Sequence, residues 1–154
     1  MEQAGRVNPD RLFLWGGLSV PYDIRHRLEE LRKLRSEQRR HAQLAENAMG
    51  RATVAMSTKR AIDRGGTGTC PLTEYAPVYA QHRDYAREAG EKADGLWRDV
   101  QPYVCALPDL DARIVVTGYY QQADSWEDVR RNVKRSESSV FRLNREAIRA
   151  MERM

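Results

Sequence analysis

Residues 125–151 read SWEDVRRNVKRSESSVFRLNREAIRAM, a pattern that predicts two helices joined by a tight turn. Ser125 and Ser136 each precede a helix-forming run, and serine is a preferred N-cap because its hydroxyl accepts a hydrogen bond from the first helical turn. An acidic residue three positions after Ser125 adds a partner like that of a capping box. We therefore expect a two-turn helix after Ser125, a turn at Lys134-Arg135, and a longer helix from Ser136 to the C-terminus.

Apolar residues at three-four spacing give each of these helices one side to bury. In the first helix they are Trp126, Val129 and Val133, and in the second they are Val140, Leu143, Ala147, Ile148 and Met151. A further helix is expected just upstream, over residues 109–122, with an apolar face of Leu110, Ile114, Val115 and Tyr119. Residues 107–154 are thus predicted to form a three-helix module.

The polar residues of this module make it a candidate DNA-binding unit. A two-turn helix, a tight turn and a longer basic helix form the plan that places the last helix in a DNA major groove. On the last helix, the candidates for contact with base edges are Glu137, Ser138, Ser139, Arg142 and Arg145. Around the turn, the candidates for contact with phosphates are Arg130, Arg131, Lys134 and Arg135. The alternative for the same residues is a three-helix bundle with solvated charges.

These residues also resemble a known family. The segments Ser125–Val129, Ser136–Leu143 and Glu146–Ile148 are similar to the region-4-type helix-turn-helix of sigma factors. The similarity is closest to small phage-encoded transcriptional regulators of late genes, the ArpU/RinA-like group, which also carry a long charged helical region before the DNA-binding unit. The resemblance implies binding to promoter or operator DNA, control of transcription and a phage or prophage origin. It also makes RNA polymerase a candidate partner.

Three positions depart from this family pattern. Arg130 stands where a small residue is usual, Lys134 stands at the usual glycine of the turn, and Arg135 stands at a usual aliphatic position. A residue other than glycine at positive φ costs roughly 1 kcal/mol. We therefore expect the turn to differ from the standard one, and the bulk of Arg130 to widen the packing of the two helices.

Upstream, residues 23–106 predict a long antiparallel helical hairpin, so that the whole chain is expected to be all-α. The first helix is expected from Asp23 to about Ile62, with a narrow, alanine-rich apolar stripe. Its members are Ile24, Leu28, Leu31, Gln38, Ala42, Ala45, Met49, Ala52 and Met56. A glycine-rich loop over residues 63–73 reverses the chain. The second helix is expected to run from about Thr73 until Pro102 and Pro108 bend or break it.

The hairpin is predicted to be an oligomerisation element. Its first helix is basic and its second is acid-rich, so opposite charges on neighbouring faces can set their register. A narrow stripe of alanines suits a close helix–helix seam. We expect this seam to join two chains into a homodimer that presents two modules to double-stranded DNA.

Residues 1–22 are predicted to be a leader, poorly ordered or packed on the hairpin. Its apolar strip, Leu12–Leu18, is too short to span a bilayer, so no membrane association is expected. The net charge of +4 favours polyanionic partners. A cytoplasmic location is expected, which is the host bacterial cytoplasm if the protein is phage-encoded.

The sequence predicts no catalysis, cofactor or metal site. Cys70 and Cys105 are far apart and are expected to be reduced thiols. The histidines His26, His41 and His82 are assigned to separate charged helical contexts, so no zinc site is expected. The glycine-rich loop lacks the lysine of a P-loop. No nucleophile is paired with a base, and no paired carboxylates lie in an apolar setting.

A DNA-binding transcriptional regulator of phage or prophage type is therefore the expected function. One alternative is a DNA-packaging protein like a small terminase subunit, which also combines a helix-turn-helix with an oligomerising hairpin. In such proteins the DNA-binding unit usually precedes the hairpin, whereas here it follows. A helical scaffold without DNA binding is the third possibility.

Overall fold

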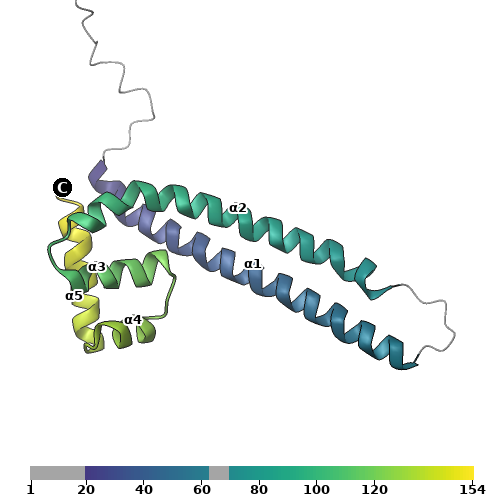
Figure 1. Cartoon of the computed structure of the whole chain (residues 1–154). Helices are drawn as coiled ribbons and strands as arrows, with labels where there is room; N and C mark the ends of the chain where they lie inside the picture. The colour runs from purple at the N-terminus through teal and green to yellow at the C-terminus, as the bar shows by residue number, and fades with distance from the viewer. Residues whose placement is uncertain (1–19, 63–69) are drawn as a thin grey trace, which may run out of the picture.

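The computed structural model describes residues 20–62 and 70–154, all of it built from helices and short connections (Figure 1). The leader up to residue 19, including the Leu12–Leu18 strip, and loop residues 63–69 lie outside the described residues. The elements are α1 (Val20–Ile62), α2 (Pro71–Ala106), α3 (Leu110–Val116), the π-helix η2 (Thr117–Gln121), α4 (Trp126–Val133) and α5 (Glu137–Met151). The predicted all-α fold, a long helical hairpin followed by shorter helices, is confirmed.

Helices α1 and α2 lie side by side and antiparallel, with the shorter helices gathered at one end of the pair (Figure 1). Ion pairs cross between the basic and the acidic helix. Arg27 Nη1 lies 3.3 Å from Asp99 Oδ2, and Arg35 Nη2 lies 2.5 Å from Asp94 Oδ1. Exposed pairs of this kind contribute little stability each. Their effect is to favour this register of the hairpin over shifted ones.

The helix ends differ from the sequence expectation in three places. Helix α1 begins at Val20 rather than Asp23, because Pro21 falls in the first turn, where no intrahelical N–H bond is lost. Helix α2 begins at Pro71 for the same reason. Pro102 does not end the second helix, which continues to Ala106. The apolar residues on both sides of this proline remain buried, so packing holds the helix together where one backbone hydrogen bond is missing.

The alanine-rich stripe is buried within the hairpin itself. Ala45, Ala48 and Ala52 of α1 are buried, as are Ala89 and Ala93 of α2. Two other members of the predicted stripe, Ala42 and Met49, are exposed. The expectation that this seam joins two copies of the chain is therefore wrong, because one chain already fills it. A homodimer would have to use another face of the hairpin.

The first helix of the module buries a different face from the one expected. Leu110 and Ile114 are 65% and 37% exposed, whereas Ala112, Val115 and Val116 are buried. The predicted helix over residues 109–122 is also not one regular α-helix, because the π-helix η2 follows α3 directly. The wider turn of a π-helix shifts the facing of every later residue. The π-helix follows Leu110 and Ile114, so the exposure of these two residues reflects how α3 itself packs, with Val115 the expected residue of α3 that is buried.

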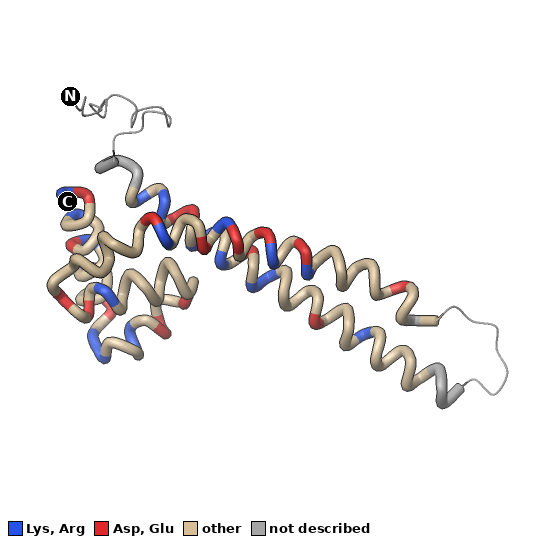
Figure 2. The backbone as a smooth tube through the Cα atoms, turned by 45° about the horizontal axis from the view of Figure 1, so that its top comes forward, with Lys and Arg blue, Asp and Glu red and all other residues tan. Residues whose placement is uncertain are grey.

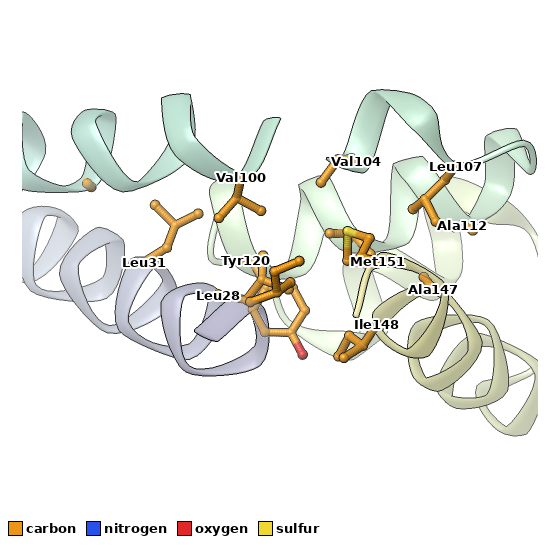
Figure 3. Close-up of a cluster of buried hydrophobic side chains, with 13 residues drawn as sticks. Leu28, Leu31, Val100, Val104, Leu107, Ala112, Tyr120, Ala147, Ile148 and Met151 are labelled. Atoms are coloured by element: carbon orange, nitrogen blue, oxygen red, sulfur yellow. The ribbon is translucent and has the colours of Figure 1, made fainter. Parts of the chain in front are cut away.

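A single buried cluster joins the base of the hairpin to the module (Figure 3). Leu28 and Leu31 of α1 and Val100 of α2 belong to it, together with Ile148 and Met151 of α5. The cluster therefore spans the predicted boundary between residues 106 and 107. Because side chains from both parts bury one another, the module is held in a fixed orientation on the hairpin.

Basic residues of α1 add polar contacts to this junction. The guanidinium of Arg32 lies over the Tyr119 ring, with Cζ 3.5 Å from the ring centre. Arg35 Nε donates to Gln121 Oε1 at 3.4 Å. Arg39 Nη1 donates to the carbonyl oxygen of Ala123 at 3.2 Å. The basic charge of α1 was expected to set the register of the hairpin against the acid-rich second helix. The structure shows that Arg32, Arg35 and Arg39 contact η2 and the turn that follows it.

Tyr120 links η2 to α5. Its ring is buried, and its hydroxyl accepts a hydrogen bond from Asn144 Nδ2 at 3.2 Å. Burial raises the pKa of the Tyr120 hydroxyl, and the hydrogen bond from Asn144 opposes part of that rise. Tyr120 therefore stays neutral where an exposed tyrosine would begin to ionise.

The shared cluster predicts a large difference between two leucine substitutions. Leu28→Ala should lower the free energy of unfolding by about 2–5 kcal/mol, because it opens a cavity between the hairpin and the module. Leu110→Ala, the matched control on the exposed side of α3, should change it by less than about 0.5 kcal/mol. Urea unfolding followed by far-UV circular dichroism measures both. Equal effects would contradict the assignment of the core.

Candidate nucleic-acid interface

Helices α4 and α5 begin at the serine N-caps that the sequence predicts. The Ser125 hydroxyl accepts a hydrogen bond from the Asp128 backbone N–H at 3.2 Å and donates to the Asp128 carboxylate at 2.6 Å. The Ser136 hydroxyl accepts from the Ser139 backbone N–H at 3.4 Å. The two serines therefore fix where α4 and α5 begin, and with that the length of the turn.

The turn itself passes through the left-handed region. Lys134 has φ 53° and ψ 42°, and its backbone N–H donates to the carbonyl oxygen of Arg130. This is the conformation that usually favours glycine at a helix C-terminus. The expectation that a lysine here changes the turn is therefore wrong for the backbone. The side chain of Arg130 is exposed and reaches Glu127, so it does not wedge the two helices apart.

Aromatic side chains of η2, α4 and α5 pack against one another in this helix pair. The Tyr119 and Trp126 rings stack with centroids 3.6 Å apart, and the Phe141 ring meets Trp126 edge-on at 4.9 Å. Beneath them, Val129 of α4 and Val140 of α5 are buried against α3. Side chains from α4, α5 and η2 thus fix the angle between α5 and the other helices of the module.

The exposed face of α5 holds three of the predicted contact residues. Ser138, Arg142 and Arg145 are exposed and recur at three-four spacing, opposite the buried Val140. Phe141 lies beside them and is 38% exposed, although sequence reasoning had not assigned it to either face. Phe141 follows Ser138 by three residues, which places it on the same exposed side of α5. This spacing could have predicted its exposure from the sequence.

The short polar residues at the start of α5 are not equivalent. The Ser139 hydroxyl lies 2.8 Å from the Ser136 hydroxyl and is half-buried. Ser138 is exposed, with its hydroxyl 3.3 Å from that of Ser136, and Glu137 is exposed in the first turn. Ser139 therefore belongs to the cap, and Glu137 and Ser138 are the residues here that remain available to a ligand.

Most of the predicted phosphate-contact residues are engaged in ion pairs. Arg130 Nη2 lies 2.9 Å from Glu127 Oε1. Arg131 Nη1 lies 3.2 Å from Asp128 Oδ1, and Arg135 Nε donates to Asp111 Oδ2 at 2.6 Å. Glu127 and Asp128 are exposed and Asp111 is half-buried, so a phosphate would replace the carboxylates of Glu127 and Asp128 at little cost. Arginines at this turn are thus held in place rather than left free.

Lys134 and Arg145 differ from the other cations of the candidate site. Within the part of the chain that the structure describes, neither has a hydrogen bond or ion pair through its side chain. Arg142 has only a long contact, 4.0 Å from Nε to Glu146 Oε1. Residues 125–154 hold eight cations and five carboxylates. Blue and red segments accordingly alternate over this end of the molecule (Figure 2). The excess of positive charge therefore resides in the turn and along α5.

Comparison with known proteins identifies no relative: no family model, no curated protein and no solved structure matches this chain. The resemblance to sigma-type regulators therefore rests on the residues of α4 and α5 alone.

The left-handed turn predicts that one substitution will raise stability. Lys134→Gly should raise the free energy of unfolding by about 0.5–1 kcal/mol relative to Lys134→Gln, because glycine adopts this conformation without a steric cost. Both variants remove the same charge, so their difference isolates the backbone. Chemical unfolding of the two proteins checks it, and a Lys134→Gly variant less stable than Lys134→Gln would contradict the turn.

Proposed function

We propose that this protein binds double-stranded DNA through α5 and acts as a transcriptional regulator of phage or prophage type. The observation that carries the proposal is the exposed face of α5, where Ser138, Arg142 and Arg145 share one stripe. Serine and arginine contact base edges and phosphates in major grooves. The short helix α4 and the tight turn precede α5 in the order that such DNA-binding units have.

Contacts with the DNA backbone would come from the turn. Lys134 is exposed at the left-handed residue of the turn and has no ion pair among the described residues, which suits it to a phosphate. Arg130, Arg131 and Arg135 surround it and would exchange their present carboxylate partners for phosphates. In this proposal these four residues position the module, and the face of α5 supplies sequence preference.

The regulatory part of the proposal comes from the resemblance of residues 125–148 to sigma-type modules. It implies promoter or operator DNA as the ligand, with RNA polymerase as a candidate second partner, and requires no cofactor. A cytoplasmic location and a homodimer are part of the same proposal. The junction at the base of the hairpin supports it, because a fixed module can transmit the position of the hairpin to the DNA.

A DNA-packaging role of the small-terminase type is the second candidate. It shares the combination of a helix-turn-helix with a helical hairpin, and the described part of that hairpin far from the module shows few charged residues in Figure 2, which suits association with other chains. The order of the two parts favours the regulator, since the DNA-binding unit follows the hairpin.

The proposal predicts different losses for two substitutions. The specific site is first obtained by selecting bound sequences from random DNA at fixed salt. Arg142→Ala should then weaken binding to that site by about 1–3 kcal/mol, with a smaller effect on calf-thymus DNA. Lys134→Gln should weaken both alike and lower the slope of log K against log salt by about 1.

Arg51→Ala is the matched control for these variants, because Arg51 is exposed on α1, in the part of the hairpin remote from the module. It should bind both DNAs as the parent protein does. If Arg142→Ala and Lys134→Gln also bind like the parent, α5 is not the DNA-binding helix.

Oligomer size separates the two candidate functions. A regulator that reads two half-sites should be a dimer in solution, whereas a packaging ring should contain eight or more chains. Light scattering coupled to size exclusion measures the mass directly, at micromolar concentration. A mass equal to one chain would contradict both arrangements and leave DNA binding by a monomer.

A further inference from the structure

Two histidines meet in the middle of the hairpin. His41 of α1 and His82 of α2 place their Nδ1 atoms 3.1 Å apart, and their rings lie 5.3 Å apart at an angle of 30°. Both side chains are half-buried. The sequence had assigned them to separate charged surroundings, and the structure corrects this assignment. Residues 41 positions apart become neighbours because the hairpin is antiparallel.

The helices come close together near this pair. At Gly90 of α2, an added Cβ would lie 2.6 Å from Nε2 of Gln38, which is one turn from His41 on α1. The His41 ring also lies 5.2 Å from the Tyr85 ring. Among the described residues, neither imidazole forms an ion pair with a carboxylate. The two rings are therefore held together by the fold and not by a charged partner.

The spacing of the two nitrogens suits a metal ion as well as a shared hydrogen. Without a metal, one Nδ1 must carry a hydrogen and the other must accept it. Two imidazole nitrogens at about 2.0–2.1 Å from one tetrahedral ion are about 3.3–3.4 Å apart. A small separation of the rings converts one arrangement into the other.

We propose that His41 and His82 bind one divalent transition-metal ion through their Nδ1 atoms. On binding, the hydrogen between the rings leaves Nδ1 through solvent, and the same imidazole takes a hydrogen at Nε2. Both ligands are then neutral imidazoles protonated at Nε2, and no net proton is released. No group of three or more His, Cys, Asp or Glu that could hold a metal is present in the described part of the chain. Water therefore completes the coordination shell.

The chemistry of the ligands selects the ion. Imidazole nitrogen suits zinc, cobalt, nickel and copper, whereas magnesium and calcium prefer oxygen ligands. The bound ion would cross-link α1 and α2 near the middle of the hairpin. Beyond this point, the buried residues of α1 are the small side chains Ala45, Ala48 and Ala52. The site would therefore stabilise the outer half of the hairpin, where packing is thinnest.

Titration calorimetry of the full chain with zinc chloride tests the site. The protein carries no affinity tag, and Cys70→Ser and Cys105→Ser remove the two exposed thiols that could also bind zinc. We expect one ion per chain, binding weakened at least tenfold by His41→Gln and by His82→Gln, and no binding of magnesium. His26→Gln is the matched control, because His26 is exposed on the same helix, and it should bind zinc like the parent.

Copper provides a second readout that does not depend on the folding of a variant. Electron paramagnetic resonance of the parent protein with one equivalent of copper should show two coordinated imidazole nitrogens. Zinc affinity equal in the parent, His41→Gln and His82→Gln would overturn the site, as would the absence of zinc binding by the parent. Copper coordinated by fewer than two imidazoles would also overturn it.

Discussion

The orientation of α5 depends on one interaction, the burial of the module against the base of the hairpin. Leu28 and Leu31 of α1 lie in the same buried cluster as Ile148 and Met151 of α5. Arg32 covers Tyr119 at the edge of this cluster, and Tyr119 in turn stacks on Trp126 of α4. A chain of direct contacts therefore runs from α1 to the start of the candidate DNA-binding pair. These contacts fix the orientation of α5 relative to the two long helices.

This connection is accompanied by a different role for the alanine-rich stripe of the hairpin from the one expected. Its alanines were expected to hold two chains together, yet Ala45, Ala48 and Ala52 pack within one chain. The result is a stiff antiparallel arm that carries the module at one end and leaves its other end free of contact with the module (Figure 1). In the proposed function, the arm provides surface for further chains or for polymerase, and the module provides the contact with DNA.

The parts that could be predicted from sequence are those set by local chemistry. Ser125 and Ser136 cap the helices they precede, and the charges of α1 and α2 pair across the hairpin, because capping and charge patterns act over a few residues. What could not be predicted depends on geometry between elements. The packing of α3 on its neighbours leaves Leu110 and Ile114 at the surface, and the register of the hairpin brings His41 next to His82. The DNA-contact role of the predicted residues stays a prediction, whereas the involvement of Ser139 in the cap and the exposure of Phe141 required the structure.

In the proposed function, α5 and the turn before it meet DNA while the outer hairpin does not. Backbone amide NMR spectra of the full chain, recorded during titration with a DNA duplex obtained by selection, test this residue by residue. The largest shifts are expected at Lys134 to Ser138 and along the exposed stripe to Arg145, with residues around Ala48 and Ala52 unchanged. Shifts confined to the hairpin, or none at all with DNA bound, would contradict it.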